Sequence, residues 1–188
     1  PVAVIFFKTS IGFFIKASEF FKPPAAVVSR RLLDSDATEN PFADLGPPGP
    51  LRAILTTAAA GDVLHQQAWQ RVCTALDLVP ERIQRVPQRH TRRVVVAGEA
   101  PRTARLPADG MIAKAADQAL CIMVADCLPL FLIADDGENP TLLHSGWRST
   151  GIVADALAYL KRRFGRNAAR YHAIIGPGIG PCCYTVPA

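Results

Sequence analysis

Apolar residues along the chain follow two spacings, one typical of buried strands and one typical of amphipathic helices. Continuous apolar runs at 119–124 (ALCIMV) and 128–134 (LPLFLIA) predict strands that are buried on both faces. Shorter apolar runs predict further strands at 2–7, 11–15, 92–97 and 141–144, and another in AIIG, ahead of the glycine-rich turn GPGIGP. A turn at 8–10 would join the first two of these strands.

Helical spacing appears in two places. The first predicted helix begins at Gly61-Asp62, with Asp62 as its cap, and stops at Pro80. The second begins at Ser149 or Thr150 and ends at Gly165. Their apolar faces are Val63, Leu64, Ala68, Val72, Ala75 and Leu76 in the first, and Ile152, Val153, Ala156, Leu157 and Leu160 in the second.

The segment 22–60 shows neither spacing. It contains Pro23-Pro24 and the run NPFADLGPPGP, which argue against a helix or a central strand, so we expect irregular structure there. Elsewhere strands and helices follow one another without strict alternation, and no internal repeat is visible. The pattern predicts an α+β fold, a single domain over 1–188 with mixed β-sheet layers flanked by helices.

Composition narrows the class of protein. A chain of 188 residues that is 49% hydrophobic can bury a sizeable core, which excludes a disordered protein. Five cysteines without a CxxC pair do not form a secreted disulfide framework, so we expect reduced thiols and a cytoplasmic protein. Lys8, Lys16 and Glu19 interrupt the apolar N-terminal run, so we expect neither a membrane span nor a signal peptide.

The charge is moderately basic. The formal net charge is +5, and seven arginines lie between Arg82 and Arg105. Such a cluster could contact nucleic acid. No recognition motif accompanies it, so we interpret it as a solvated surface and expect no nucleic-acid partner.

Candidate chemistry lies at the ends of the predicted strands. Cys127 follows one apolar run and His144 ends another, while His90 precedes a third. One thiolate and two imidazoles suit zinc, and three protein ligands leave a fourth position open, as in catalytic sites. From spacing alone, Cys127 could equally be a buried apolar side chain or a nucleophile paired with His144. His65 and His172 have no partner motif, and we assign them structural or surface roles.

Several short motifs point to a known family. QRHT at 88–91, ADCLP at 125–129, HSGWRS at 144–149 and GPGIGPCCYTV at 176–186 occur in this order. They resemble QVHG, ADC(L/V)P, HAGWRG and GPxIGPCCYEV of the laccase-domain family. That family was once called multicopper polyphenol oxidases, and it is also known as peptidoglycan editing factor and as purine nucleoside phosphorylases of the FAMIN type. The segment LPADGMIAKAADQAL at 106–120 also looks like the family, and the resemblance covers about 61–187.

The resemblance implies a single zinc ion held by His90, Cys127 and His144. It implies phosphorolysis of purine nucleosides, with a nucleoside and phosphate as partners, and with adenosine deamination and methylthioadenosine cleavage as side activities. Arg148, at the predicted start of a helix, would bind phosphate or the charge that develops in the reaction, and the alternative for it is a structural ion pair. Of the neighbouring side chains, we expect Trp147 to be a wedge of the core and Asp126 either to orient a metal ligand or to cap a turn.

Three alternatives remain open. A polyphenol oxidase would need several copper ions, whereas the sequence offers one three-ligand set, so copper is disfavoured. A Cys-His hydrolase acting on peptidoglycan precursors would use Cys127 as its nucleophile. A truncated relative would bind a partner without catalysis.

The chain also departs from the family pattern. Arg89 and Thr91 replace a valine and a glycine, and Ser145 and Ser149 replace an alanine and a glycine. The family's early TTRxGGVS motif is not visible in 1–45, and we expect the family's C-terminal segment to be missing after Ala188. One wall of the site is therefore expected to differ.

Overall fold

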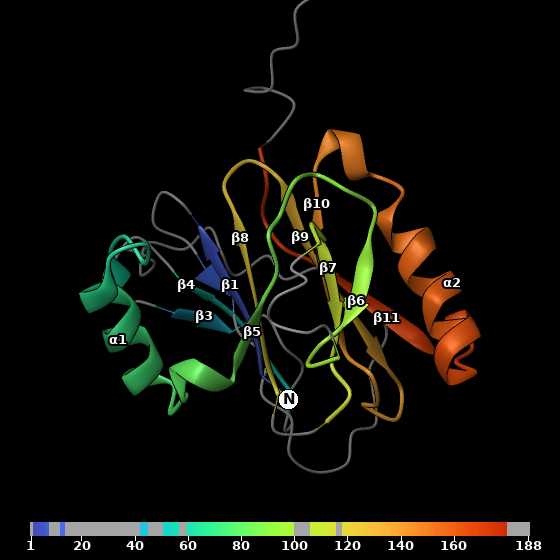
Figure 1. Cartoon of the computed structure of the whole chain (residues 1–188), viewed down its shortest axis with the longest axis horizontal. Coiled ribbons are helices and arrows are strands. Elements are labelled where there is room, and N and C mark those ends of the chain that lie inside the picture. Colours follow the sequence, from blue (N-terminus) through green and yellow to red (C-terminus); the bar gives the residue numbers. More distant parts are fainter. Residues whose placement is uncertain are drawn as a thin grey trace, which may run out of the picture.

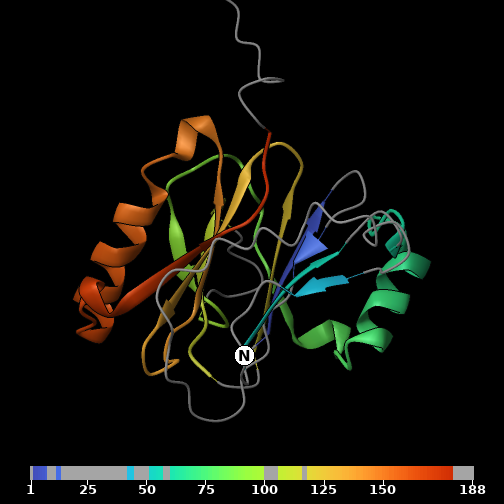
Figure 2. The ribbon, with the colours of Figure 1, turned by 180° about the vertical axis from the view of Figure 1, so that it is seen from behind.

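A computed structural model describes residues 2–7, 12–13, 42–44, 51–56, 60–99, 106–115 and 118–179, with side chains described from residue 51 onward. Two β-sheets lie face to face, and one helix covers the outer side of each sheet (Figure 1). The view from behind shows the same order of layers, helix, sheet, sheet, helix (Figure 2).

The first sheet is largely parallel. It has the strand order β2-β4-β1-β8-β5, and β3 also pairs with β4. Strands β1, β4, β5 and β8 run parallel to one another, whereas β2 and β3 run antiparallel to β4. Its strands are β1 (Val2–Phe7), β2 (Gly12–Phe13), β3 (Phe42–Asp44), β4 (Arg52–Thr56), β5 (Ile83–Arg85) and β8 (Ala119–Val124).

The second sheet is largely antiparallel. It has the order β11-β9-β10-β7-β6, and only β6 and β7 pair in parallel. Its strands are β6 (Val94–Val96), β7 (Gly110–Ile112), β9 (Leu128–Ala134), β10 (Thr141–Ser145) and β11 (Tyr171–Ile175). The helices in the described ranges are α1 (Gln66–Ala75), α2 (Ile152–Phe164) and the short 3-10 helices η4 (Pro80–Arg82), η5 (Trp147–Ser149) and η6 (Ala168–Arg170).

The layers explain the continuous apolar runs. Along β8, Leu120 and Ile122 belong to the core between the sheets, while Cys121 packs in the cluster under α1. Along β9, Phe131 enters the core between the sheets and Leu132 packs in the cluster under α2. A strand between two apolar layers needs apolar residues on both faces, so its sequence does not alternate between apolar and polar residues.

The predicted α+β class with mixed sheets is confirmed. The strands at 2–7, 119–124 and 128–134 have the predicted bounds. Gly165 ends α2 with a φ of 66°, in the left-handed region that glycine adopts without strain. The predicted turn at 8–10 and residues 180–188 lie outside the described residues.

The prediction that 22–60 is irregular was wrong. Strands β3 and β4 lie within it, and β4 is a central strand because β1 pairs with one side of it and β2 and β3 pair with it as well. Five residues are too short for a periodic signal, and their parallel partner, β1, lies about fifty positions earlier. Strands β5 and β7 are three residues each and were also missed.

Both predicted helix starts were early. Asp62 forms a turn ahead of α1, accepting hydrogen bonds from the N–H groups of Leu64 and His65, and the helix itself begins at Gln66. Helix α2 begins after Gly151, because 147–149 form the separate 3-10 helix η5. None of the helices in the described part of the chain is long and apolar enough to cross a membrane.

Candidate metal centre

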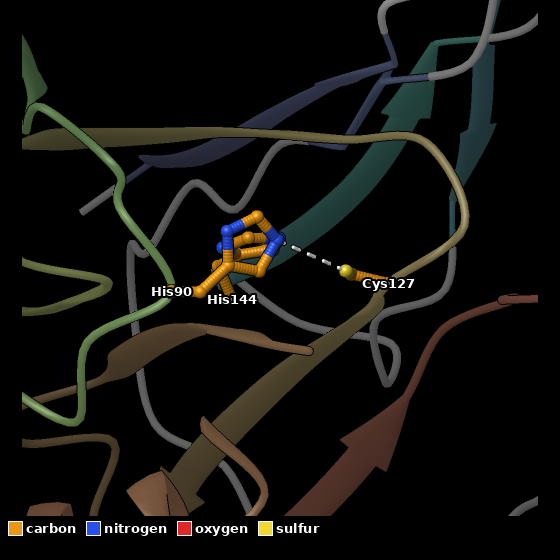
Figure 3. Close-up of side chains that lie close together, drawn as sticks. All are labelled: His90, Cys127 and His144. Atoms are coloured by element: carbon orange, nitrogen blue, oxygen red, sulfur yellow. Dashed lines mark hydrogen bonds between the residues drawn. The ribbon is translucent and has the colours of Figure 1, made fainter. Parts of the chain in front are cut away.

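Three of the predicted site residues meet at one end of the second sheet. His90, Cys127 and His144 each offer a donor atom, and all of these atoms lie within 4.8 Å of one another. Figure 3 shows the two imidazole rings beside each other with Cys127 facing them. The Sγ atom of Cys127 lies 3.6 Å from Nε2 of His90, and the two ring centroids are 4.9 Å apart.

Strand pairing explains why residues 17 positions apart come together. Cys127 lies in the turn that leads from β8 in the first sheet to β9 in the second. Strand β9 pairs antiparallel with β10, so that Pro129 faces His144 and Leu128 faces Ser145. The start of β9 and the end of β10 are therefore adjacent, which places Cys127 beside His144.

The loop that carries His90 is attached to β8 by a side chain. Gln88 donates from Nε2 to the carbonyl of Met123 at 2.6 Å and accepts from the Met123 N–H at 2.7 Å. The amide of Gln88 thus makes the two hydrogen bonds that a neighbouring strand would make. This anchor fixes the loop to β8 two residues before His90.

Asp109, at the start of β7, holds both histidines. Its Oδ1 accepts from the His90 N–H at 3.0 Å and lies 2.7 Å from Nδ1 of His144. Asp109 is fully buried and His144 is 4% exposed. Burial alone would raise the pKa of Asp109, but hydrogen bonds from His144, Thr91 and Arg89 outweigh it and lower the pKa to about 2.

Our reading of the sequence did not find Asp109. It lies in LPADGMIAKAADQAL, a segment that we noted only for its family resemblance. A single carboxylate directly before an apolar triplet, Gly110–Ile112, was the available signal, since a buried acid must find partners.

The thiol of Cys127 is in a negative environment. Burial raises its pKa, and the charges of Asp126 and Asp109 raise it further. An activated cysteine nucleophile has a lowered pKa instead. The thiol therefore stays protonated at neutral pH unless a cation such as a metal ion displaces the proton.

Gly146 leaves room beside the cluster. A Cβ atom at this position would lie 2.6 Å from Cδ2 of His90 and 3.0 Å from Sγ of Cys127. The backbone there is extended, with φ −93° and ψ 172°, so the glycine is needed for space and not for conformation. A side chain at 146 would fill the space between the donors.

The separation of two of the donors agrees with tetrahedral ligation of a metal ion. With Zn–N distances of about 2.0–2.1 Å and a Zn–S distance of about 2.3 Å, tetrahedral ligation separates nitrogen from sulfur by about 3.5 Å. The 3.6 Å between His90 and Cys127 agrees with this separation. Within the described ranges, this is the one group of three or more His, Cys, Asp or Glu donors placed to share an ion.

Three further residues singled out in the sequence, Arg148, Trp147 and Asp126, are not among the three donors. Arg148 is exposed on η5, with its guanidinium carbon 5.7 Å from the centre of the Trp147 ring. Trp147 is 71% exposed, so its interpretation as a wedge of the core was wrong. Asp126 accepts the Ile179 N–H through its main-chain carbonyl, which ties the segment after β11 to the turn that carries Cys127.

The two histidines assigned structural or surface roles lie outside the cluster. His65 faces Asp62 at 3.7 Å on the surface. His172, on β11, has its Nε2 2.7 Å from Oδ1 of Asp135.

Comparison with known proteins decides the family. The family model described as multi-copper polyphenol oxidoreductase laccase matches residues 60–188. The chain belongs to this family. The match includes every residue of the His-Cys-His group and of the loop and strand ends that position it.

Relatives in the laccase family carry the name purine nucleoside phosphorylase. The one called YlmD, from Geobacillus stearothermophilus, is 38% identical over 80 residues, 42% of this chain and 29% of that protein. One from Xylella fastidiosa (strain Temecula1) is 29% identical over 169 residues, 87% of this chain and 63% of that protein. One from Corynebacterium glutamicum is 31% identical over 127 residues, 62% of this chain and 49% of that protein. The chain thus spans between 29% and 63% of the length of these curated relatives.

Solved structures of the family share the fold. The crystal structure of YlmD from Geobacillus stearothermophilus superposes with a TM-score of 0.59 at 25% identity, over 79% of this chain and 58% of that one. The crystal structure of the Bacillus licheniformis hypothetical protein YfiH gives a TM-score of 0.61 at 24% identity, over 94% of this chain and 61% of that one.

Proposed function

We propose that this chain, as one laccase-family domain, carries the catalytic zinc centre of a purine nucleoside phosphorylase. The observation that carries the proposal is the convergence of one thiol and two imidazoles within 4.8 Å. The names of the relatives support the reaction, which is cleavage of adenosine or inosine by phosphate to the base and ribose 1-phosphate. Adenosine deamination and methylthioadenosine cleavage are the side activities that we propose with it.

The ligands in this proposal are Nε2 of His90, Sγ of Cys127 and Nε2 of His144. When bound, zinc supplies a Lewis acid and lowers the pKa of a coordinated water. The thiol of Cys127 gives up its proton when it becomes a ligand, which removes it as a free nucleophile. The single three-donor group in the part of the chain that the structure describes favours one zinc ion over a set of several coppers.

Arg148 has the anion-binding role in this proposal. In phosphorolysis a phosphate oxygen forms a bond to C1′ of the ribose, the bond from C1′ to the base breaks, and the base takes up a proton. The guanidinium of Arg148 can hold phosphate with two parallel hydrogen bonds. Its position supports this, because it is exposed four residues after His144 and, among the described residues, no acidic side chain forms an ion pair with it.

One contact favours a second candidate, a Cys-His hydrolase. The 3.6 Å between Sγ of Cys127 and Nε2 of His90 also suits a nucleophile and its base. In this arrangement the partner is His90, whereas we had considered His144, which instead contacts Asp109. The raised pKa of Cys127 argues against the hydrolase.

Metal content and a nucleoside panel separate these functions. The wild type should hold one zinc ion per chain and release purine base only when phosphate is present. His90→Ala, Cys127→Ala and His144→Ala should each lose most of the zinc, and the control His172→Ala should retain it. Cys127→Ala with full zinc but no activity would establish the nucleophile, and several coppers would establish the oxidase.

Arg148→Lys tests the anion site. We expect unchanged zinc and a phosphate-dependent rate lower by about 30- to 1000-fold, since lysine cannot reproduce the two-pronged contact. Arg163→Lys is the control, because Arg163 lies on the exposed end of α2 and pairs with Glu99. An Arg148→Lys variant with the wild-type response to phosphate would remove Arg148 from the site.

A further inference from the structure

We propose that Asp109 is a positioning residue that sets both histidines of the cluster at once, fixing the ring of His144 through Nδ1 and the backbone of His90. The inference rests on the proposed metal site for its purpose, but the contacts that carry it are those of the protein alone. The contacts of the Asp109 carboxylate are with groups of the protein, two of them on the histidines, so it acts through those two ligands.

The carboxylate of Asp109 is fully engaged. Oδ1 contacts the His90 N–H at 3.0 Å and Nδ1 of His144 at 2.7 Å. Oδ2 accepts from the Arg89 N–H at 3.1 Å, the Thr91 N–H at 2.6 Å and the Thr91 hydroxyl at 2.8 Å. An ionised carboxylate offers about four lone-pair sites, so five donors leave none unused.

The first consequence concerns the proton on His144. An ionised carboxylate only accepts hydrogen bonds, so Nδ1 of His144 must carry the proton. The lone pair of the neutral ring is then on Nε2, the nitrogen that the proposed metal site uses. The main chain of Asp109 adds to this control, because its carbonyl accepts the His144 N–H at 2.7 Å. The side chain and the main chain of Asp109 together fix the His144 ring in one orientation.

The second consequence concerns the backbone of His90. His90 has a φ of 57°, in the left-handed region that costs a residue with a side chain about 1 kcal/mol or more. Three consecutive N–H groups, of Arg89, His90 and Thr91, converge on the one carboxylate. Those hydrogen bonds hold the loop in this conformation, which brings Nε2 of His90 to 3.6 Å from Cys127.

The chain contains a matched pair for comparison. His172 and Asp135 also approach to 2.7 Å, but their side chains are 41% and 27% exposed. Asp135 is shared with Arg170 and lies away from the three-donor group. Asp135→Asn therefore removes a histidine-carboxylate contact of equal length without touching the cluster.

Asp109→Asn is the decisive variant. Asparagine keeps the size of the side chain but replaces one acceptor by an NH₂ donor. Placed at Oδ1, the NH₂ faces His90 N–H and makes His144 move its proton to Nε2. Placed at Oδ2, it faces two backbone N–H groups of the loop. Both orientations put a donor against a donor and disturb at least one histidine.

Zinc affinity measured by chelator competition, without any nucleoside, gives the first readout. We expect Asp109→Asn to bind zinc about 10- to 100-fold more weakly, as other removals of a ligand's hydrogen-bond partner do. In cobalt-substituted protein, its visible absorption bands should shift, reporting altered ligation. Asp135→Asn should match the wild type in both measurements. Equal zinc affinity and equal cobalt spectra in Asp109→Asn and the wild type would overturn the proposal.

The second readout needs no variant and no metal. Nitrogen-15 NMR of the metal-free wild type should show a proton on Nδ1 of His144, and a ring that lacks a proton on Nδ1 would overturn the proposal even if Asp109→Asn does not fold. This measurement also separates the two proposals. Wild-type protein that binds no zinc but has His144 protonated on Nδ1 would refute the zinc function and leave the positioning role of Asp109 supported.

Discussion

Gly146→Ala should weaken zinc binding about 100-fold while leaving the fold intact. The extended backbone at 146 accepts alanine without strain, so the only perturbation is the new methyl group. That methyl would lie 2.6 Å from Cδ2 of His90 and 3.0 Å from Sγ of Cys127. Ordinary contacts begin at 3.4 Å, so the histidine ring must retreat by 0.8 Å and the sulfur by 0.4 Å.

These displacements set the expected magnitude. Metal sites hold their ligand distances to within about 0.2 Å, so a shift of this size removes the fit of His90 and Cys127 to one ion. A 100-fold loss of zinc affinity corresponds to about 2.7 kcal/mol. The metal-free protein should lose only about 1–2 kcal/mol, since His90 is exposed and its ring can move outward.

The assay compares denaturant unfolding with and without zinc, together with chelator competition. Zinc-dependent stabilisation should fall by about 2.7 kcal/mol in Gly146→Ala. Gly137→Ala is the control, because it has nothing within 4 Å but a φ of 73°, so it should cost stability and leave zinc binding unchanged. Wild-type zinc affinity in Gly146→Ala would refute the reasoning, as would an equal loss of affinity in the control.

Three further predictions concern stability and charge. The pKa of Asp109 falls from 3.8 to about 2 on folding, so its contribution of about 2 kcal/mol is present above pH 4 and is lost as the pH falls toward 2. Urea unfolding across this range should show the loss in the wild type and not in Asp109→Asn; parallel curves would contradict it. Gln88→Ala leaves both backbone groups of Met123 without their partner and should lower the free energy of unfolding in urea by about 2–3 kcal/mol. The control Gln84→Ala removes an exposed contact and should lower it by less than about 0.5 kcal/mol. The arginines from Arg82 to Arg105 should give no nucleic-acid complex tighter than micromolar at moderate salt; a tight complex that weakens steeply with salt would overturn this.

Sequence alone determined the elements whose signals are long or local. The runs at 119–124 and 128–134 predicted buried strands, and Gly165 predicted the end of a helix, because burial on two faces and a left-handed φ each restrict residue type directly. The motifs around His90, Cys127 and His144 likewise identified which side chains to place together.

Tertiary structure decided what depends on distant partners. Strand β4 is central only because β1, far earlier in the chain, pairs with it, and nothing in RAILT itself records that pairing. The exposure of Trp147 likewise follows from where η5 lies. Asp109 is the clearest case. Its carboxylate meets donors 18 to 35 positions away in sequence, and a hydrogen-bond acceptor acquires such a role only when folding brings those donors to it.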